Sequence, residues 1–402
     1  MLKNFTAAPH RVMFFGGALQ AIAVMLWWTM ELAMRYGIVG LPISWAVAPS
    51  AAHVFLMIYS MLPFFMFGFL MTTFPRWMAG KEITPKLYVT AFGFMFLGAV
   101  LFYVGMVISV AILVVAVASA LAGWGVALYS LVRVLMDTRP GDKRHPIALA
   151  ISLAMGWCGL ASFLGWLLTD ESVFYNFSIQ SGLWFFLMPL FASVAHRMIP
   201  FFTSNALSQR DVPRPFWPWW TMLAGSVVHG VLSFSGSTNW LWLCDAPIAA
   251  SALYLSYLWG FRRSLSNPLL AVLHVGFAWM GIAMLFFTTQ SLVAFISGEY
   301  IWALAPLHAL TIGCYATLMI GMGTRVTLGH SGLPFNIGTS IKLMFLGMQL
   351  VTLLRVMADV LPVQNSYVWY VVSAIGWLAC FSPWVWRYLP AFWRPRADGQ
   401  PG

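Results

Sequence analysis

The sequence predicts an all-α polytopic membrane protein with about twelve transmembrane helices, forming a single integral membrane domain over residues 1–402. Composition is the first observation behind this prediction. Of the 402 residues, 61% are hydrophobic and only 8% are charged, whereas soluble domains carry about 25% charged residues. The second observation is that the apolar sequence runs from residue 12 to residue 390 with only short polar breaks. These runs are continuous rather than alternating, which excludes a transmembrane β-barrel.

Each expected span follows from the length that a helix needs to cross the hydrocarbon core, about 20 apolar residues. By this criterion the spans are residues 13–34, 49–74, 88–106, 110–135, 147–169, 178–199, 217–237, 241–261, 268–291, 302–323, 340–362 and 367–390. The third and fourth share one apolar stretch, which we expect to divide between Gly105 and Ser109. The first span is too long for a cleavable signal and has no small-residue cleavage site after it.

Basic residues predict how the spans are oriented. With both termini in the cytoplasm, the inner loops are 75–87, 136–146, 200–216, 262–267 and 324–339, and one of them holds the basic cluster Arg139/Lys143/Arg144. Every Lys and Arg except Arg35 and Arg355 then lies on the inner side, as the positive-inside rule requires. The net charge of +10 faces anionic lipid and does not imply nucleic-acid binding. Five acids fall on the outer side: Asp170, Glu171, Asp245, Glu299 and Asp359.

Cysteine spacing excludes several metal centres. Cys158, Cys244, Cys314 and Cys380 stand singly on different spans, so there is no CxxC pair of the kind that holds zinc or an iron–sulfur cluster. No CxxCH motif occurs either, so any haem would be held noncovalently. We expect the four cysteines to be small buried apolar residues. A Gly-rich phosphate loop is also missing, which argues against an ATP-driven pump.

Histidines are the main candidates for function, because a histidine in hydrocarbon is costly unless it has a partner. His53 and His308 lie in the outer halves of the second and tenth spans, both of which run inward. At about 1.5 Å per residue their depths differ by only several ångströms. Two imidazoles at one depth on two helices could be the axial ligands of a haem b, since haem iron takes one ligand on each face of the ring.

Other histidines suggest a second site or none. His10 and His330 lie at the inner surface and His274 in the inner half of the ninth span, where they could form a second metal or proton site. Each could instead bind water, cap a helix or bond to a neighbouring helix. The remaining histidines carry weaker indications: His229 lies in mid-span without a motif around it, and His145 and His196 are expected to be solvated.

Charged residues in the outer halves of the spans offer local pairs. Arg355 and Asp359 are one helical turn apart, as are Glu31 and Arg35. Arg355 could alternatively hold a haem propionate, because a guanidinium matches a carboxylate through two parallel hydrogen bonds. His53 also shares a helix face with Met57, a combination of imidazole and thioether that could bind Cu(I).

Several local motifs together resemble one protein family. In chain order they are PHR at 9–11, GFLMTTFPRW at 68–77, RMIPFFT at 197–203, LHVGFAW at 273–279, HALTIG at 308–313 and TRVTLGHSG at 324–332. Taken in this order on about twelve spans, they resemble the NnrS family over essentially the whole chain. That resemblance implies a bacterial inner-membrane protein that carries haem and copper and is associated with nitric oxide metabolism and nitrosative stress.

The chain departs from the family pattern at one place. The family usually has His-x-His-Glu-Met at the start of the second span, whereas here Phe55 and Leu56 follow His53 where the second histidine and the acid would stand; Met57 is kept. The resemblance therefore implies haem more firmly than copper.

Three functions stay open. The first is a haem metalloprotein of nitric oxide response or denitrification, with His53, His308 and Arg355 at the haem and an unknown redox partner. Spans 6 and 7 lack the paired histidines of an oxidase copper site, which argues against a full oxidase or a standard nitric oxide reductase. The second is a transporter for a metal, haem or a small solute, although no repeat between residues 1–199 and 217–390 is evident. The third is a non-catalytic assembly or sensor protein.

Overall fold

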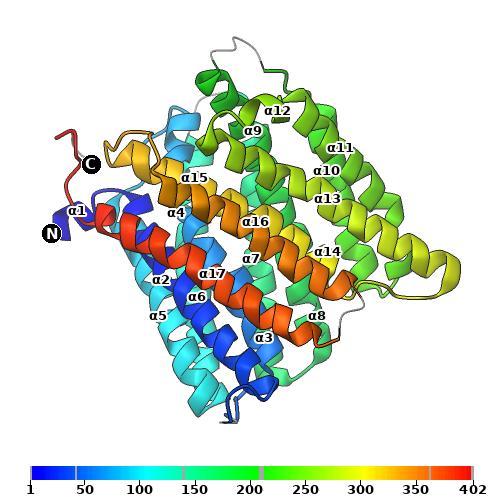
Figure 1. Ribbon diagram of the computed structural model, residues 1–402. Helices are drawn as coiled ribbons and strands as arrows, with labels where there is room; N and C mark the ends of the chain where they lie inside the picture. The colour runs from blue at the N-terminus through cyan, green and yellow to red at the C-terminus, as the bar shows by residue number, and fades with distance from the viewer. Residues whose placement is uncertain (1, 41–42, 138–140, 208–211, 362–363, 400–402) are drawn as a thin grey trace. The chain divides into compact units, whose positions relative to one another are not determined.

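The computed structural model describes residues 2–40, 43–137, 141–207, 212–361 and 364–399, and every regular element in these ranges is helical (Figure 1). Within these ranges, ten helical segments are long and apolar enough to cross a membrane. They are α2 (Pro9–Arg35), α3–η1–α4 (Pro49–Trp77), α5 (Pro85–Ile108), α6 (Val110–Asp137), α7 (Arg144–Thr169), α8–η2–α9 (Ser172–Ala206), α13 (Pro268–Ser297), α14–η4–α15 (Ala305–His330), α16 (Thr339–Val360) and α17–η5 (Ser366–Phe392). The all-helical, multi-span prediction is confirmed.

Two further expected spans are also helical but shorter. They are α10 (Phe216–Phe234) and α11 (Trp242–Leu258), joined through the 3₁₀ turn η3 (Thr238–Trp240). With 17 residues, α11 lies at the lower limit for a spanning helix. The remaining short helices are α1 (Leu2–Phe5) and α12 (Phe261–Ser264). The total of about twelve spans and the cytoplasmic position of both termini remain predictions.

The expected division of the long apolar stretch is confirmed at Ser109, which is extended and separates α5 from α6. Beyond that break the two helices pack closely as a hairpin. A Cβ on Gly98 would lie 2.7 Å from the backbone oxygen of Ala116, and one on Gly123 would lie 2.7 Å from that of Ala91. Glycine is needed at both positions because small residues let transmembrane backbones approach.

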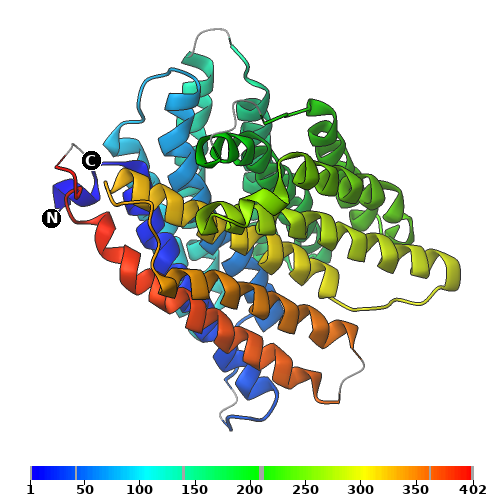
Figure 2. The ribbon, with the colours of Figure 1, turned by 45° about the horizontal axis from the view of Figure 1, so that its top comes forward.

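The chain divides into two compact units. The first comprises Met1–Leu187, Val326–Leu333 and Trp384–Gly402; the second comprises Met188–Arg325 and Pro334–Pro383. Within the first, α2 packs on α4, where Gly16 and Gly17 face the rings of Phe64 and Phe65. Within the second, α13 packs along the α10–α11 hairpin (green and yellow-green in Figure 2), and α16 packs on α14 and η4.

Three spans are interrupted by π-helical segments in the described chain: η1 (Phe55–Met61), η2 (Ser181–Leu187) and η4 (Ala309–Ala316). Pro63 and Pro189 follow the first two by two residues. A proline inside a helix removes one hydrogen bond and crowds the preceding turn, so a wider turn before it relieves the clash. Such insertions often occur at functional sites, and here they fall in the second, sixth and tenth expected spans.

Candidate functional site

His53 lies on α3, two residues before η1, and is half-buried. Its ring stacks on the indole of Trp28, with centroids 4.1 Å apart and planes inclined by 22°. The guanidinium of Arg35 lies 5.3 Å from the centroid of Trp28 and pairs with Glu31 at 2.9 Å, which confirms the expected pair. Glu31 also accepts a hydrogen bond from the Trp45 indole. A fixed aromatic and ionic network therefore orients the imidazole of His53.

His308 ends α14, directly before η4, and belongs to the second compact unit. Its Nδ1 lies 2.9 Å from the backbone oxygen of Leu304. A carbonyl oxygen can only accept, so Nδ1 must donate its hydrogen there. In a neutral ring this leaves the lone pair on Nε2, which is the atom that could take a metal. His308 is half-buried, so this atom is not sealed in the core.

Arg355 on α16 is engaged by two neighbours. Its Nη1 lies 2.8 Å from Asp359 Oδ2, and its guanidinium carbon lies 4.4 Å from the centroid of the Tyr370 ring. The Tyr370 hydroxyl donates to the other oxygen of Asp359. The expected local pair is thus confirmed, and it is part of a three-residue network. Arg355 is in the same unit as His308, and the helices that carry them pack together.

His10 and His330 come together in the first compact unit, with ring centroids 4.6 Å apart. Thr72 accepts from the backbone N–H of His10 at 3.2 Å, and its hydroxyl lies 3.5 Å from Nδ1 of the same histidine. His10 is only 1% exposed, although the sequence suggested the inner surface. The positive charges acting on this pair are those of Arg11, Arg76 and Arg396. Two members of the expected inner site are therefore in contact, in cationic surroundings.

His274, the third member, lies on α13 in the second unit and is 1% exposed. Its Nε2 is 2.9 Å from Thr203 Oγ1, and that hydroxyl donates to the backbone oxygen of Ile199. Nε2 must therefore donate to Thr203, which ties α13 to α9. Among the described residues Nδ1 has no hydrogen-bond partner. This matches the structural alternative, a hydrogen bond between neighbouring helices.

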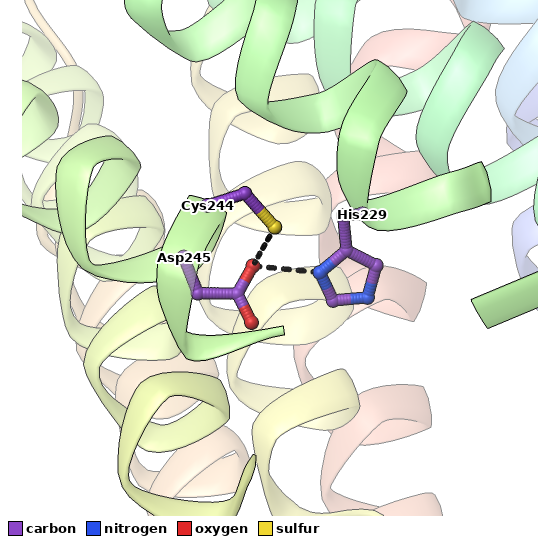
Figure 3. Close-up of side chains that lie close together, drawn as sticks. All are labelled: His229, Cys244 and Asp245. Atoms are coloured by element: carbon purple, nitrogen blue, oxygen red, sulfur yellow. Dashed lines mark hydrogen bonds and ion pairs between the residues drawn. The ribbon is translucent and has the colours of Figure 1, made fainter. Parts of the chain in front are cut away.

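A further cluster lies in the second unit between α10 and α11 (Figure 3). His229 Nδ1 is 2.6 Å from Asp245 Oδ1, and Cys244 Sγ lies 3.6 Å from the same oxygen. One ligand atom from each of the three residues lies within 4.8 Å of the other two, so the group could hold a metal ion. Gly225, one turn before His229, brings the helices together, because a Cβ there would lie 2.6 Å from Ile248.

The cluster is sealed from water. The exposed fractions are 2% for His229, 6% for Cys244 and 0% for Asp245. Phe287 of α13 covers the imidazole edge-on at 5.2 Å. Asp245 Oδ2 has no hydrogen-bond partner among the described residues. A buried carboxylate is costly unless it is paired or coordinates a metal, so Asp245 has an unmet need beyond its bond to His229.

Comparison with known families matches nearly the whole chain to one of them. A family model described as "NnrS protein" covers residues 4–396. The chain belongs to the NnrS family. A search of curated proteins finds no match. The resemblance inferred from the ordered motifs is therefore confirmed.

The two residues of this NnrS chain that depart from the expected pattern after His53 pack in the protein core. Phe55 and Leu56 are both 0% exposed. The Phe55 ring stacks on Phe102, with centroids 3.9 Å apart. Phe55 and Leu56 are therefore core residues at the two positions where the resemblance leads us to expect a histidine and an acid.

Two histidines expected to be solvated are buried, so that prediction is wrong for both. His145 is 0% exposed because α7 begins at Arg144, one residue before it, and takes the ring into the helix bundle. His196 is also 0% exposed; its Nε2 donates to the backbone oxygen of Pro215, and its ring stacks on Trp219.

Asp245 is buried in the first turn of α11, where it faces His229; its expected place on the outer side stays a prediction. Cys158 is exposed, unlike the other three cysteines, so the expectation of four buried cysteines is wrong for it. Arg139 of the basic cluster lies outside the described residues.

Sequence reasoning did not predict the His229 cluster. His229 and Asp245 are separated by 16 positions across a helical hairpin, with no motif around either. The one usable signal was that an acid and a histidine occupy neighbouring spans near the same connecting turn, where each can neutralise the other.

Proposed function

We propose that this NnrS protein is a haem b protein of the bacterial inner membrane that acts in the nitric oxide response or in denitrification. His53 on the second span and His308 on the tenth are its axial ligands. The observation that carries the proposal is that both histidines have the same kind of position on their own helices, in a protein of this family. Each is a half-buried histidine at the start of a span, within two residues of a π-helical segment.

The donor chemistry of both residues fits a haem. His308 has the tautomer that an iron ligand needs, because its Nδ1–H donates a hydrogen bond to the Leu304 carbonyl and Nε2 keeps its lone pair. The flat contact with Trp28 limits rotation of the His53 ring. Helices hold both histidines before any cofactor arrives, which reduces the entropy lost on ligation.

A haem held there would supply an iron that changes oxidation state and, with one weak axial ligand, could bind nitric oxide. The protein's own contribution is to position two neutral imidazoles and to neutralise propionate charge. Arg355 suits the second task, since a guanidinium can form two parallel hydrogen bonds to a carboxylate. Its bond to Asp359 would have to be shared with, or exchanged for, a propionate.

The inner histidines support a second, distinct role. The rings of His10 and His330 are in contact, as a second metal site or a proton-transfer site would require. The family motif around His274 is the reason to include it in the same site. The three nearby arginines oppose a bare metal cation, so proton transfer is the better reading of this pair. For copper, His53 and Met57 are the two expected ligands that the chain keeps, since Phe55 and Leu56 stand at the positions of the additional histidine and acid.

An absorption spectrum of the purified protein tests the haem directly. We expect a Soret band that is lost or shifted in both His53→Ala and His308→Ala. Gln180→Ala is the matched control, since Gln180 is also half-buried and directly precedes a π-helical segment, η2. A wild-type spectrum in both histidine variants would refute the assignment.

A transporter is the second candidate, and the interrupted helices favour it. Transporters build their sites on broken helices near mid-membrane, and three spans here contain π-helical segments. Protein purified without a Soret band, yet moving metal or haem into vesicles, would favour this function over the first.

A further inference from the structure

We propose that His229, Cys244 and Asp245 bind a divalent transition metal, and that zinc is the ion that this ligand set suits best. The site is separate from the proposed haem site and uses none of its residues.

The ligand chemistry points to a borderline-soft divalent ion. Imidazole, thiolate and carboxylate are the three ligand types that proteins use for zinc. With a neutral imidazole, the thiolate of Cys244 and the carboxylate of Asp245 carry two negative charges. A divalent cation makes the complex neutral, which is the favourable state for a group sealed inside a helix bundle. Cu(I) would leave one negative charge uncompensated, and hard ions such as Mg²⁺ avoid sulfur.

The distances require little movement. Around a tetrahedral zinc ion, neighbouring ligand atoms lie about 3.3–3.6 Å apart, given metal–ligand lengths of about 2.0–2.3 Å. Cys244 Sγ and Asp245 Oδ1 already lie 3.6 Å apart. His229 Nδ1 and Asp245 Oδ1, now 2.6 Å apart, would separate by several tenths of an ångström once the imidazole hydrogen moves from Nδ1 to Nε2 and Nδ1 becomes a ligand atom. Binding then releases one proton, the thiol hydrogen of Cys244.

Asp245 supplies an independent indication of a ligand. Its Oδ2 is fully buried and has no hydrogen-bond partner among the described residues. The other oxygen, Oδ1, accepts hydrogen bonds from His229 and from the weak donor Cys244. A bound cation would neutralise the negative charge of this carboxylate, of which the His229 imidazole contacts one oxygen.

The site also lies close to an exposed turn of the chain. His229 is five residues before the end of α10, about 7.5 Å along the helix, and Asp245 is in the first turn of α11. The connection between them is exposed at Ser235, Gly236 and Asn239. The sealed cluster therefore lies within about two helical turns of exposed backbone.

Cobalt and zinc binding by the purified full-length protein tests the proposal. We expect one zinc per chain, and for Co²⁺ a near-ultraviolet charge-transfer band that only a thiolate ligand gives. Cys244→Ala should abolish the band, and His229→Gln and Asp245→Asn should weaken zinc binding at least tenfold. Cys380→Ala is the matched control, because Cys380 is similarly buried, at 8% against 6% exposed, and should leave both signals intact.

Three outcomes would overturn the site: no cobalt–thiolate band in the wild type, equal zinc binding by the Cys244 and Cys380 variants, or stoichiometric Cu(I) in place of zinc. The first two would mean that His229 and Asp245 form a structural pair only. Should a variant fail to fold, X-ray absorption of the zinc-loaded wild type decides, since it must contain one sulfur at about 2.3 Å among nitrogen and oxygen ligands. The Soret band, measured in parallel, reports on the haem proposal independently.

Discussion

The imidazole of His53 lies flat on the indole of Trp28, with 4.1 Å between ring centroids. A stacked ring can turn only by losing that contact, so Trp28 acts as a positioning residue for His53. The guanidinium of Arg35 also contacts the Trp28 indole, and it forms an ion pair with the Glu31 carboxylate.

Replacing Trp28 should therefore affect haem binding without removing a ligand. We expect Trp28→Leu to lower haem occupancy about two- to tenfold, because an aromatic contact is worth about 0.5–1.5 kcal/mol. Trp28→Phe, which keeps a flat ring, should restore most of it. Haem-to-protein ratios from absorption spectra measure both, and equal occupancy in all three proteins would exclude a positioning role.

Arg355 and Asp359 can be separated by their effects. Asp359→Asn should lower stability by about 1–3 kcal/mol, since it breaks a largely buried pair, but should leave the haem spectrum unchanged. Arg355→Gln should lower stability similarly and also reduce haem occupancy. Thermal unfolding in detergent and the Soret band give the two readouts. Identical spectra for both variants would assign Arg355 a structural role alone.

Thr203 should stabilise the protein through His274. Thr203→Val removes the acceptor of a buried N–H, at a cost of about 1–3 kcal/mol, whereas Thr203→Ser keeps it. Thr288→Val is the control, because the Thr288 hydroxyl donates to the backbone oxygen of Met284 in its own helix. If the Thr203→Val protein has the same melting temperature as the wild type, the His274 N–H has another hydrogen-bond acceptor.

The α5–α6 hairpin should be sensitive to a single methyl group at the crossing point. Gly98→Ala would place a Cβ 2.7 Å from a backbone oxygen, and overpacking of this kind costs about 1–3 kcal/mol. Gly93→Ala, on the same helix with nothing within 4 Å of the new Cβ, should be neutral or slightly stabilising. Melting temperatures of the two variants, compared in one detergent, check this; a lower value for Gly93→Ala would contradict it.

Cysteine labelling tests the orientation. Gly141 and Asn239 are both exposed, and the charge pattern places them on opposite sides, Gly141 in the cytoplasm. In a Cys158→Ser background, Asn239→Cys should react with an impermeant maleimide in intact cells, and Gly141→Cys only after lysis. The reverse pattern would invert the topology.

Hydrophobic length predicted where the helices lie. Each expected span contains a helix in its described residues, and ten of these helical segments are long and apolar enough to cross a membrane, because a backbone in lipid must satisfy its own hydrogen bonds and a helix does so within one segment. The break at Ser109 and the pairs Glu31–Arg35 and Arg355–Asp359 could also be predicted, since each depends on residues close in sequence.

The sequence by itself thus determined the class, the family and the local ion pairs of this protein. Tertiary structure decided which buried polar groups meet. It brought His229 to Asp245 across a helical hairpin and placed His10 against His330. It also buried His145 and His196, which the spacing of residues in the sequence did not predict. The physical reason is that hydropathy depends on each residue separately, whereas the partner of a buried side chain depends on which helix faces pack together, and in a chain that is apolar on every side the sequence pattern does not specify those faces.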